Sequence, residues 1–338
     1  MDDRARGDDV REPHGRLHRR DDTSTIRTWG AERAVATSHL RTAGIETAAL
    51  DADVLLAHVA GVEKETLYGH PDTELSRGAC ERYRELIDRR ARGEPVAYLR
   101  GWKEFYGLRF AVDPRVLIPR PETETLVEAA RGHIAGRALT VVDVGTGSGA
   151  VAIAIAAHEP RVNVIATDVS ADALAVAHAN ALSNGVADRI ELRQGDLLTP
   201  LTAPVDVVVA NLPYLRPEAL AELVGERTSL AYEPRVAVVA GADGLSLLRR
   251  AIAELPRVLA RGGAAFFEVD PAQSRTVAQL LEATLGGAVR LTRDLAGEAR
   301  VVASSYDIRV WRGLCDSAAF PAGSMDVSAC SASRTERR

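Results

Sequence analysis

The sequence predicts an α/β protein with a mostly parallel, seven-stranded sheet, helices on both of its faces, and a small all-helical domain ahead of it. From residue 139 onward, apolar runs of strand length alternate with helix-like segments, which is typical of a parallel sheet. Residues 26–93 carry only helical periodicity, broken at glycines. The strands are expected near residues 139–144, 163–168, 190–194, 205–211, 264–269, 288–293 and 300–306.

Composition shifts divide the chain into five segments. Both ends lack apolar periodicity: the first mixes acidic, basic and histidine residues, and the last is rich in Ser and Ala. Between the helical and sheet segments, a strand-like alternation ends at Pro119 and Pro121, which stiffen the passage. The expected segments are a disordered extension over residues 1–24, a helical domain over 25–94, a β-hairpin linker over 95–124, the sheet domain over 125–312 and a disordered tail over 313–338.

Charge and composition exclude several classes of protein. The 338 residues carry a net charge of -5 with both signs mixed, and the basic balance typical of nucleic-acid binders is missing. The three cysteines have no metal-site or disulfide spacing, the apolar runs are too short to cross a membrane, and the N-terminus lacks a signal-peptide core. We therefore expect a cytoplasmic protein with no metal, no membrane contact and no nucleic-acid partner. We also expect it to be a monomer.

A glycine-rich turn is the first candidate binding site. The apolar run from residue 139 ends at Asp143 and Val144, and the turn leads into an Ala/Ile-rich helix. Glycines let the backbone approach a ligand closely. The spacing is not Gly-x-Gly-x-x-Gly, so it favours a nucleoside over a pyrophosphate. The candidate cofactor contacts in this turn are Gly145, Thr146, Gly147, Ser148 and Gly149.

An acidic residue ends the next predicted strand. Asp168 is placed to accept both ribose hydroxyls of an adenosine group, as acids at this position of such sheets do. The alternative is that Asp168 caps the following helix. Ser170 already offers a cap there, so ligand contact is the favoured interpretation.

The tetrapeptide Asn211-Leu212-Pro213-Tyr214 follows the buried run 205–210 and suits one chemical task, which is to hold a planar nitrogen nucleophile. The Asn211 side-chain oxygen and the Leu212 carbonyl are both acceptors. Pro213 biases Leu212 towards an extended conformation, and Tyr214 offers a stacking face. These residues are the catalytic and substrate-binding candidates. The alternative is a plain loop in which Asn211 caps a turn.

The order of these motifs resembles that of the class I S-adenosylmethionine-dependent methyltransferases, which have a Rossmann-like fold. Gly195-Asp196 follows the third strand, and Asn-Leu-Pro-Tyr matches the N/D-x-P-Y/F motif of the amino-methylating branch. The resemblance implies S-adenosylmethionine as the cofactor, with Asp196, Leu197 and Asn211 beside it. The family often has an aromatic residue just after Asp196, whereas Leu197 here can pack on adenine with less stacking.

The segment ahead of the glycine turn narrows the resemblance to the HemK/PrmC family, the peptide chain release factor glutamine methyltransferases. The run Pro119-Arg-Pro-Glu-Thr-Glu124 is the most specific string, and the resemblance covers about residues 27 to 310. It implies methylation of the glutamine in the Gly-Gly-Gln motif of release factors, and a helical domain that helps to recognise this protein partner. Further matching strings, in order, are Gly101–Val112, Glu233-Pro234, Gly241–Leu245, Gly262-Gly263, Glu268, Asp294–Gly297 and Arg300–Val302.

Several residues depart from the family pattern. Leu212 stands where the family usually has Pro, Val269-Asp270 replaces Ile-Gly after Glu268, and Ala299 replaces an Asp. The acceptor expected at Leu212 is a backbone carbonyl, which Leu also supplies. The Asn-Leu-Pro-Tyr spelling also occurs in ribosomal-RNA adenine dimethyltransferases. This leaves two alternatives, methylation of the adenine exocyclic amine in RNA or DNA, and methylation of a small amide or amine metabolite.

Three charged residues of the linker have two interpretations. Arg120, Glu122 and Glu124 either shape the mouth of the cofactor or substrate site or form a salt-bridged linker and helix start. Glu233 and Glu268 are expected to support the site without acting in catalysis.

Overall fold

The computed structural model describes residues 27–225 and 229–305. The predicted disordered segments over 1–24 and 313–338 therefore lie outside the described residues, as do Cys315 and Cys330.

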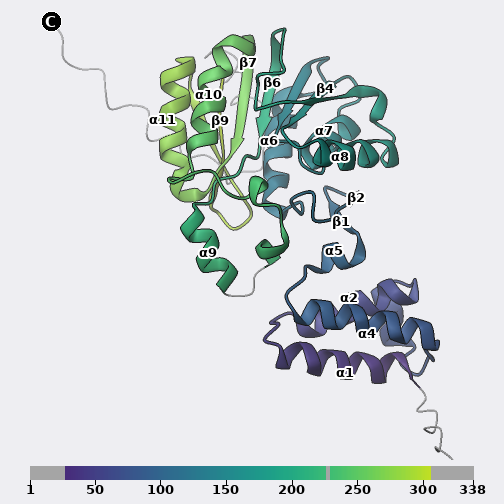
Figure 1. Ribbon diagram of the computed structural model, residues 1–338. Coiled ribbons are helices and arrows are strands. Elements are labelled where there is room, and N and C mark those ends of the chain that lie inside the picture. The colour runs from purple at the N-terminus through teal and green to yellow at the C-terminus, as the bar shows by residue number, and fades with distance from the viewer. Residues whose placement is uncertain (1–26, 226–228, 306–338) are drawn as a thin grey trace, which may run out of the picture.

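The N-terminal helices form a bundle around a core of their own, which includes Leu40, Leu55 and Tyr83. Figure 1 shows this bundle apart from the sheet, with the β1–β2 hairpin between them. Ser and Thr side chains begin two of its helices: Thr28 Oγ1 accepts from the Ala31 amide at 3.3 Å, as N-caps do. The helices of this part are α1 (Trp29–Thr42), α2 (Ala48–Ala60), α3 (Lys64–Gly69), α4 (Arg77–Ala91) and α5 (Val96–Arg100).

The predicted hairpin lies inside the linker segment. Strands β1 (Trp102–Phe105) and β2 (Leu108–Ala111) pair antiparallel, and their register joins Phe105 to Leu108. The linker also contains two short helices that the alternation did not predict, α5 before the hairpin and η1 (Pro121–Thr123) after it. The strand-like alternation expected from residue 95 is therefore wrong for Val96–Arg100, because five residues are too few to show a helical period.

A seven-stranded sheet, as predicted, forms the larger part of the molecule. Its order is β5-β4-β3-β6-β7-β9-β8, and β9 alone runs antiparallel to its neighbours. This confirms the α/β fold with a mostly parallel sheet. Strands β4 and β5 have the predicted bounds, whereas β7 begins five residues before residue 264. The strands are β3 (Thr140–Val144), β4 (Asn163–Asp168), β5 (Ile190–Gln194), β6 (Val205–Ala210), β7 (Leu259–Glu268), β8 (Val289–Arg293) and β9 (Ala299–Ser305).

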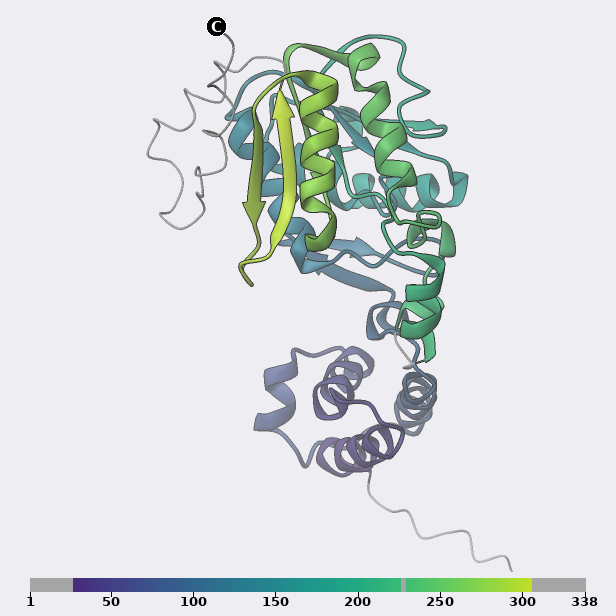
Figure 2. The same ribbon diagram turned by 90° about the vertical axis from the view of Figure 1, so that its left-hand side faces the viewer.

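Helices cover both faces of the sheet because successive strand side chains point to opposite sides. Val141 and Val209 lie in one core cluster, and Val142 and Val208 lie in the other. Figures 1 and 2 show the helices in these two layers, with α10 and α11 on one face. The helices are α6 (Glu124–Ile134), α7 (Ala150–His158), α8 (Ala171–Ser183), α9 (Pro217–Gly225), α10 (Ser246–Val258) and α11 (Ser274–Leu285), with 3₁₀ turns η2 (Ala187–Arg189), η3 (Ser229–Tyr232), η4 (Arg235–Ala237) and η5 (Pro271–Gln273).

A search of the described residues for helices long and apolar enough to cross a membrane finds none.

Candidate functional site

The strand order reverses between β3 and β6, and this point locates the site. Strands to one side of β3 continue through β4 and β5, while β6 leads to β7 on the other side. In such sheets, ligands bind beyond the carboxyl ends of the strands at the reversal. Val144 and Ala210 are register partners at these ends. The glycine turn after β3 and the Asn211 loop after β6 therefore meet at one place.

The glycine turn leaves room for a ligand on one side and packs against the Asn211 loop on the other. Gly145, Gly147 and Gly149 all have positive φ, at 71°, 55° and 81°. A Cβ at Gly145 would lie 3.0 Å from Leu212 Cδ2, whereas a Cβ at Gly147 would meet no heavy atom within 4 Å. This open backbone surface fits a nucleoside cofactor, which a side chain at Gly147 would displace.

A buried carboxylate beneath the turn holds it in shape. Asp143 accepts from Thr146 Oγ1 at 2.6 Å and from the Ala152 amide at 3.2 Å. Burial raises the pKa of Asp143 to about 6, against the opposing effect of these two hydrogen bonds. The side chains of Thr146 and Ser148 are also buried, so they shape the turn and leave its backbone to face a ligand.

Asp168 lies beside the turn, as predicted, and already binds backbone amides. Its Oδ2 accepts from the Gly147 amide and its Oδ1 from the Ser170 amide, both at 2.9 Å. Ser170 caps α8 by accepting from the Ala173 amide at 3.1 Å, which confirms the expected role of Ser170. A carboxylate can accept about four hydrogen bonds. Contact of Asp168 with ribose hydroxyls stays a prediction.

Asp196 and Leu197 follow β5 at the same edge of the sheet. Asp196 is exposed and forms an ion pair with Arg250 of α10, a partner that the sequence did not indicate. Leu197 has a positive φ of 51°, and the Thr167 hydroxyl donates to its carbonyl at 3.0 Å. Its side chain is buried against the cluster under α10. Packing of Leu197 on adenine stays a prediction.

The Asn211 amide is held by a residue that sequence reasoning did not single out. Asn211 Nδ2 donates to Thr123 Oγ1 at 2.9 Å. Thr123 is buried, and its hydroxyl lies close enough to the carboxyl of Glu268 to lower the pKa of that group. Because Nδ2 is engaged with Thr123, Oδ1 is the part of the amide available to a substrate donor.

Glu268 is a buried carboxyl with unusual proton affinity. It ends β7 next to β6, and burial raises its pKa to about 7, while Thr123 and the charge of Arg300 oppose this rise. Its Oε2 has no hydrogen-bond partner among the residues that the structure describes. Burial thus brings the pKa of Glu268 close to neutral pH, beside the Thr123 hydroxyl that holds Asn211.

The rest of the tetrapeptide packs tightly around Asn211. Leu212 is buried, and within residues 27–225 and 229–305 no group hydrogen-bonds to its carbonyl. Tyr214 is half-buried, and burial together with the negative charge of Glu268 raises the pKa of its phenol. The Tyr214 carbonyl accepts from Gln273 Nε2 at 3.3 Å. Gly244 approaches so closely that a Cβ there would lie 2.3 Å from this carbonyl oxygen.

A second buried amide, Asn180 of α8, joins the hairpin to the glycine turn. Asn180 Oδ1 accepts from the Ala111 amide at 2.7 Å, and Nδ2 donates to the Ala111 carbonyl at 3.0 Å and to the Ser148 carbonyl at 2.9 Å. Its only sequence signal was a polar residue within an apolar helical stripe.

The linker charges make structural contacts. Arg120 pairs with Glu233, whose second oxygen accepts from the Ile118 amide at 3.1 Å, and Glu124 Oε1 accepts from the Tyr106 amide at 2.8 Å. These contacts support the interpretation of a salt-bridged linker for Arg120 and Glu124. Glu122 and Glu124 both line a cavity of about 480 Å³ between α6 and the β8–β9 hairpin.

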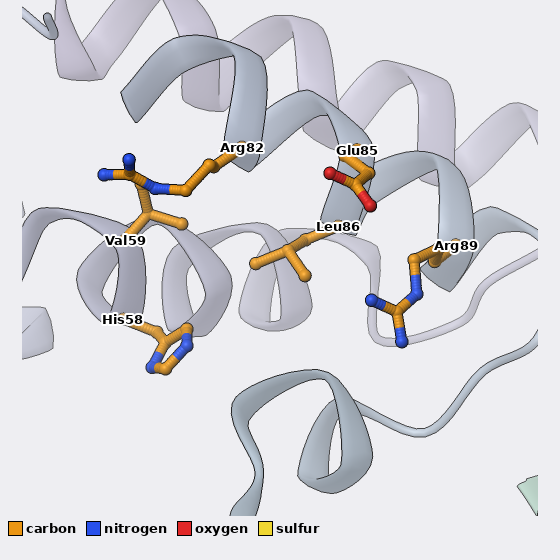
Figure 3. A pocket seen from close by; sticks show the side chains of 6 residues that line it. All are labelled: His58, Val59, Arg82, Glu85, Leu86 and Arg89. Atoms are coloured by element: carbon orange, nitrogen blue, oxygen red, sulfur yellow. The ribbon is translucent and has the colours of Figure 1, made fainter. Parts of the chain in front are cut away.

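A further hollow lies in the helical bundle, away from the glycine turn and Asn211. It has a volume of about 390 Å³, and Figure 3 shows His58 and Val59 of α2 facing a row of side chains from α4. Burial and the charges of Arg100 and Arg109 lower the pKa of His58. None of the residues lining this hollow belongs to the sheet, so it takes no part in the site described above.

Comparison with known proteins identifies the family. Residues 33–101 match the model of the PrmC N-terminal domain, and residues 122–229 match that of the methyltransferase small domain. The chain is similar to the release factor glutamine methyltransferase of Cereibacter sphaeroides, with 39% identity over 82% of this chain and 98% of that protein. It is also similar to the protein of that name in Moorella thermoacetica, with 40% identity over 78% and 94%.

Among solved structures, the hMettl16 catalytic domain in complex with the MAT2A 3'UTR hairpin 1 resembles the chain with a TM-score of 0.50. The identity is 16% over 75% of this chain and 91% of that one, so this likeness shows the fold alone. With relatives at this identity spanning nearly their whole length, the chain belongs to the family of release factor glutamine methyltransferases.

Proposed function

We propose that the protein transfers a methyl group from S-adenosylmethionine to the side-chain amide nitrogen of the glutamine in the Gly-Gly-Gln motif of peptide chain release factors. It is an S-adenosylmethionine-dependent methyltransferase, as its family implies. One structural observation carries the substrate assignment: Thr123 holds the Asn211 amide by its nitrogen at 2.9 Å, which leaves Oδ1 as an acceptor for a substrate N–H.

The substrate amide requires alignment more than activation by a base. An amide nitrogen is a poor nucleophile because its lone pair is delocalised into the carbonyl. S-adenosylmethionine would supply an already activated methyl group on a sulfonium, which leaves as the neutral thioether S-adenosylhomocysteine, while the methylated nitrogen loses one proton to solvent. Asn211 Oδ1 and the Leu212 carbonyl would accept the two amide N–H groups and aim the nitrogen in line, which is worth several orders of magnitude in rate. Pro213 sets the angle of the Leu212 carbonyl, and Tyr214 covers the flat amide.

The cofactor contacts proposed for the chain are those around the strand reversal. The open backbone at Gly147 and its neighbours Gly145, Thr146, Ser148 and Gly149 would face the cofactor, with Asp168 accepting from its ribose and Asp196 and Leu197 at its adenine end. Asn211 would lie where the cofactor and substrate sites meet, which is supported by the packing of its loop on the glycine turn. We further propose that the protein acts as a cytoplasmic monomer, with release factors rather than nucleic acid as its partner.

Transfer of a labelled methyl group to purified release factor tests the proposal. The reaction contains the wild-type release factor, a variant with Gln→Ala in its Gly-Gly-Gln motif, and an RNA sample as separate substrates. Label on the wild-type release factor alone is the expected result, and it would make Leu212 a tolerated variation of the motif. Label in RNA would support the adenine alternative. Cofactor binding with no label in either substrate would favour a small amide or amine.

A further inference from the structure

We infer that Thr123 and Glu268 are positioning residues that fix which end of the Asn211 amide faces the substrate. This inference rests on the proposed function. The three side chains come from η1, the end of β7 and the loop after β6. Asn211 is hydrogen-bonded to Thr123, and the buried carboxyl of Glu268 lies on the other side of the Thr123 hydroxyl.

The orientation of the Asn211 amide follows from the Thr123 hydroxyl, which has one hydrogen and two lone pairs. When Glu268 is ionised, its carboxylate accepts that hydrogen. The Thr123 oxygen can then only accept from Asn211, and it does so from Nδ2 at 2.9 Å. A half-turn of the amide would set Oδ1 against the Thr123 lone pairs. Thr123 thereby selects the orientation in which Oδ1 faces the substrate.

Protonation of Glu268 removes this selection. A neutral carboxyl can donate to Thr123 Oγ1, so the Thr123 hydrogen becomes free to bond to Oδ1 of the reversed amide. The reversed amide presents its NH₂ to the substrate NH₂, and two donors cannot pair. Methyl transfer should therefore be slower when Glu268 is protonated, because only part of the enzyme then presents Oδ1 to the substrate.

Several charged and titratable groups face Glu268 from the surrounding elements. Arg300 on β9 favours the carboxylate, while Glu122 on η1 disfavours it. Tyr214, after β6, titrates far above neutral pH because its pKa is itself raised. Glu268 Oε2 lacks a partner among the described residues, so Thr123 is the group through which the state of Glu268 reaches Asn211.

Thr123→Val and Thr123→Ser form a matched pair for the test, because Val keeps the shape of Thr without its hydroxyl and Ser keeps the hydroxyl. With release factor as substrate, kcat of Thr123→Val should fall about 10- to 100-fold, the effect of losing a hydrogen bond that orients a reacting group. Cofactor affinity should stay within about twofold. Thr123→Ser should restore kcat to within about threefold of wild type.

The dependence of kcat on pH is a second test, because a merely structural role of Glu268 would not change it. The wild-type kcat should fall by more than about twofold as the pH is lowered from 8 to 6, through the pKa of Glu268 near 7, and then level off at a lower value. Glu268→Gln keeps an acceptor for Thr123 but does not titrate, so its kcat should change less than about twofold between pH 6 and 8. If Thr123→Val does not fold, the comparison of the pH profiles of wild type and Glu268→Gln tests the positioning role without it.

The outcomes separate the two proposals. Equal kcat for Thr123→Val and Thr123→Ser, or parallel pH profiles for wild type and Glu268→Gln, would overturn the positioning role while wild-type methylation of release factor stands. Absence of label on release factor from the wild-type enzyme would overturn the proposed function and this inference together.

Discussion

At the scale of single residues, Asn211 carries the largest share of the proposed chemistry. Asn211→Ala removes the acceptor that would orient the substrate nitrogen, but it leaves the glycine turn and Asp168 intact. We expect kcat for release factor to fall at least about 100-fold, since loss of alignment costs this much. Calorimetric titration with S-adenosylmethionine should give a Kd within about twofold of wild type. Turnover near the wild-type level in this variant would rule out the role of Asn211.

Glu268 has opposite effects on activity and on stability. Its pKa is about 7 in the folded chain, against an ordinary value of 4.5, so folding favours the protonated form. Its contribution to the free energy of unfolding is fully present below pH 4.5 and is lost as the pH rises through 7. The ionised form that would orient Asn211 is thus the form that burial disfavours, as expected where function and stability compete.

Denaturant titrations of wild type and Glu268→Gln at several pH values should show how much unfolding free energy is lost when Glu268 ionises. Between pH 4.5 and pH 8, the wild type should lose about 3 kcal/mol of unfolding free energy relative to the variant. Buried His133 acts in the opposite sense, because burial lowers its pKa to about 4 and its contribution is lost as the pH falls from 6.5. Since both proteins contain His133, its effect cancels in the difference. A constant difference across the pH range would contradict the assignment of a raised pKa to Glu268.

At the scale of elements, the segment between β6 and α10 supports the catalytic tetrapeptide. Gly244 has a φ of 71°, and a Cβ there would lie 2.3 Å from the Tyr214 carbonyl oxygen. Gly244→Ala should therefore both destabilise the fold by about 2 kcal/mol or more and displace Tyr214, lowering kcat. Gly262 is a matched control, because its φ is 80° but a Cβ there would meet nothing within 4 Å.

Gly262→Ala should cost only about 1 kcal/mol and leave kcat unchanged. Thermal denaturation and initial rates of both variants measure the two effects separately. Equal losses of activity in the two variants would show that the close approach of Gly244 to the Tyr214 carbonyl does not affect catalysis.

Local patterns predicted most elements, and non-local contacts account for what they missed. The apolar run of β4 gave its observed bounds because buried parallel strands are largely apolar. Strand β5 lies at the edge of the sheet, and its bounds followed instead from the alternation of Ile190 and Leu192 with polar residues. The start of β7 at Leu259 was missed because Arg261 and two glycines interrupt its apolar run. Its pairing with Val205 depends on a register shift that no local pattern shows.

Only the part of the site that is built from local motifs could be predicted from the sequence. The glycine turn, Asp168 and Asn211 stand at strand ends and form local motifs. Thr123 lies 88 residues from Asn211, and Ala111 lies 69 residues from Asn180. These partners meet only after the linker folds back onto the sheet, so a pattern read along the chain could not pair them.

At the scale of the whole molecule, the bundle and the sheet have separate apolar cores. Leu56 belongs to the bundle core, while Leu281 belongs to the core under α10 and α11, and the clusters share no residue. We expect two unfolding transitions in calorimetry, of which S-adenosylmethionine raises the Tm of only one, because a ligand stabilises the unit that binds it.

Leu56→Ala should destabilise the transition that does not respond to cofactor by about 2 to 5 kcal/mol, and Leu281→Ala should destabilise the other by a similar amount. Cofactor affinity should stay unchanged in Leu56→Ala. A single transition that shifts as a whole in both variants would mean that the two cores unfold as one unit.

The buried amide of Asn180 has a consequence for how the two binding events communicate. The same side chain bonds to both backbone groups of Ala111 in the hairpin and to the Ser148 carbonyl in the glycine turn. Neither segment can shift without straining the bonds to the other. If bound cofactor raises the affinity for a protein that contacts the hairpin, then that bound protein must raise the affinity for the cofactor by the same factor.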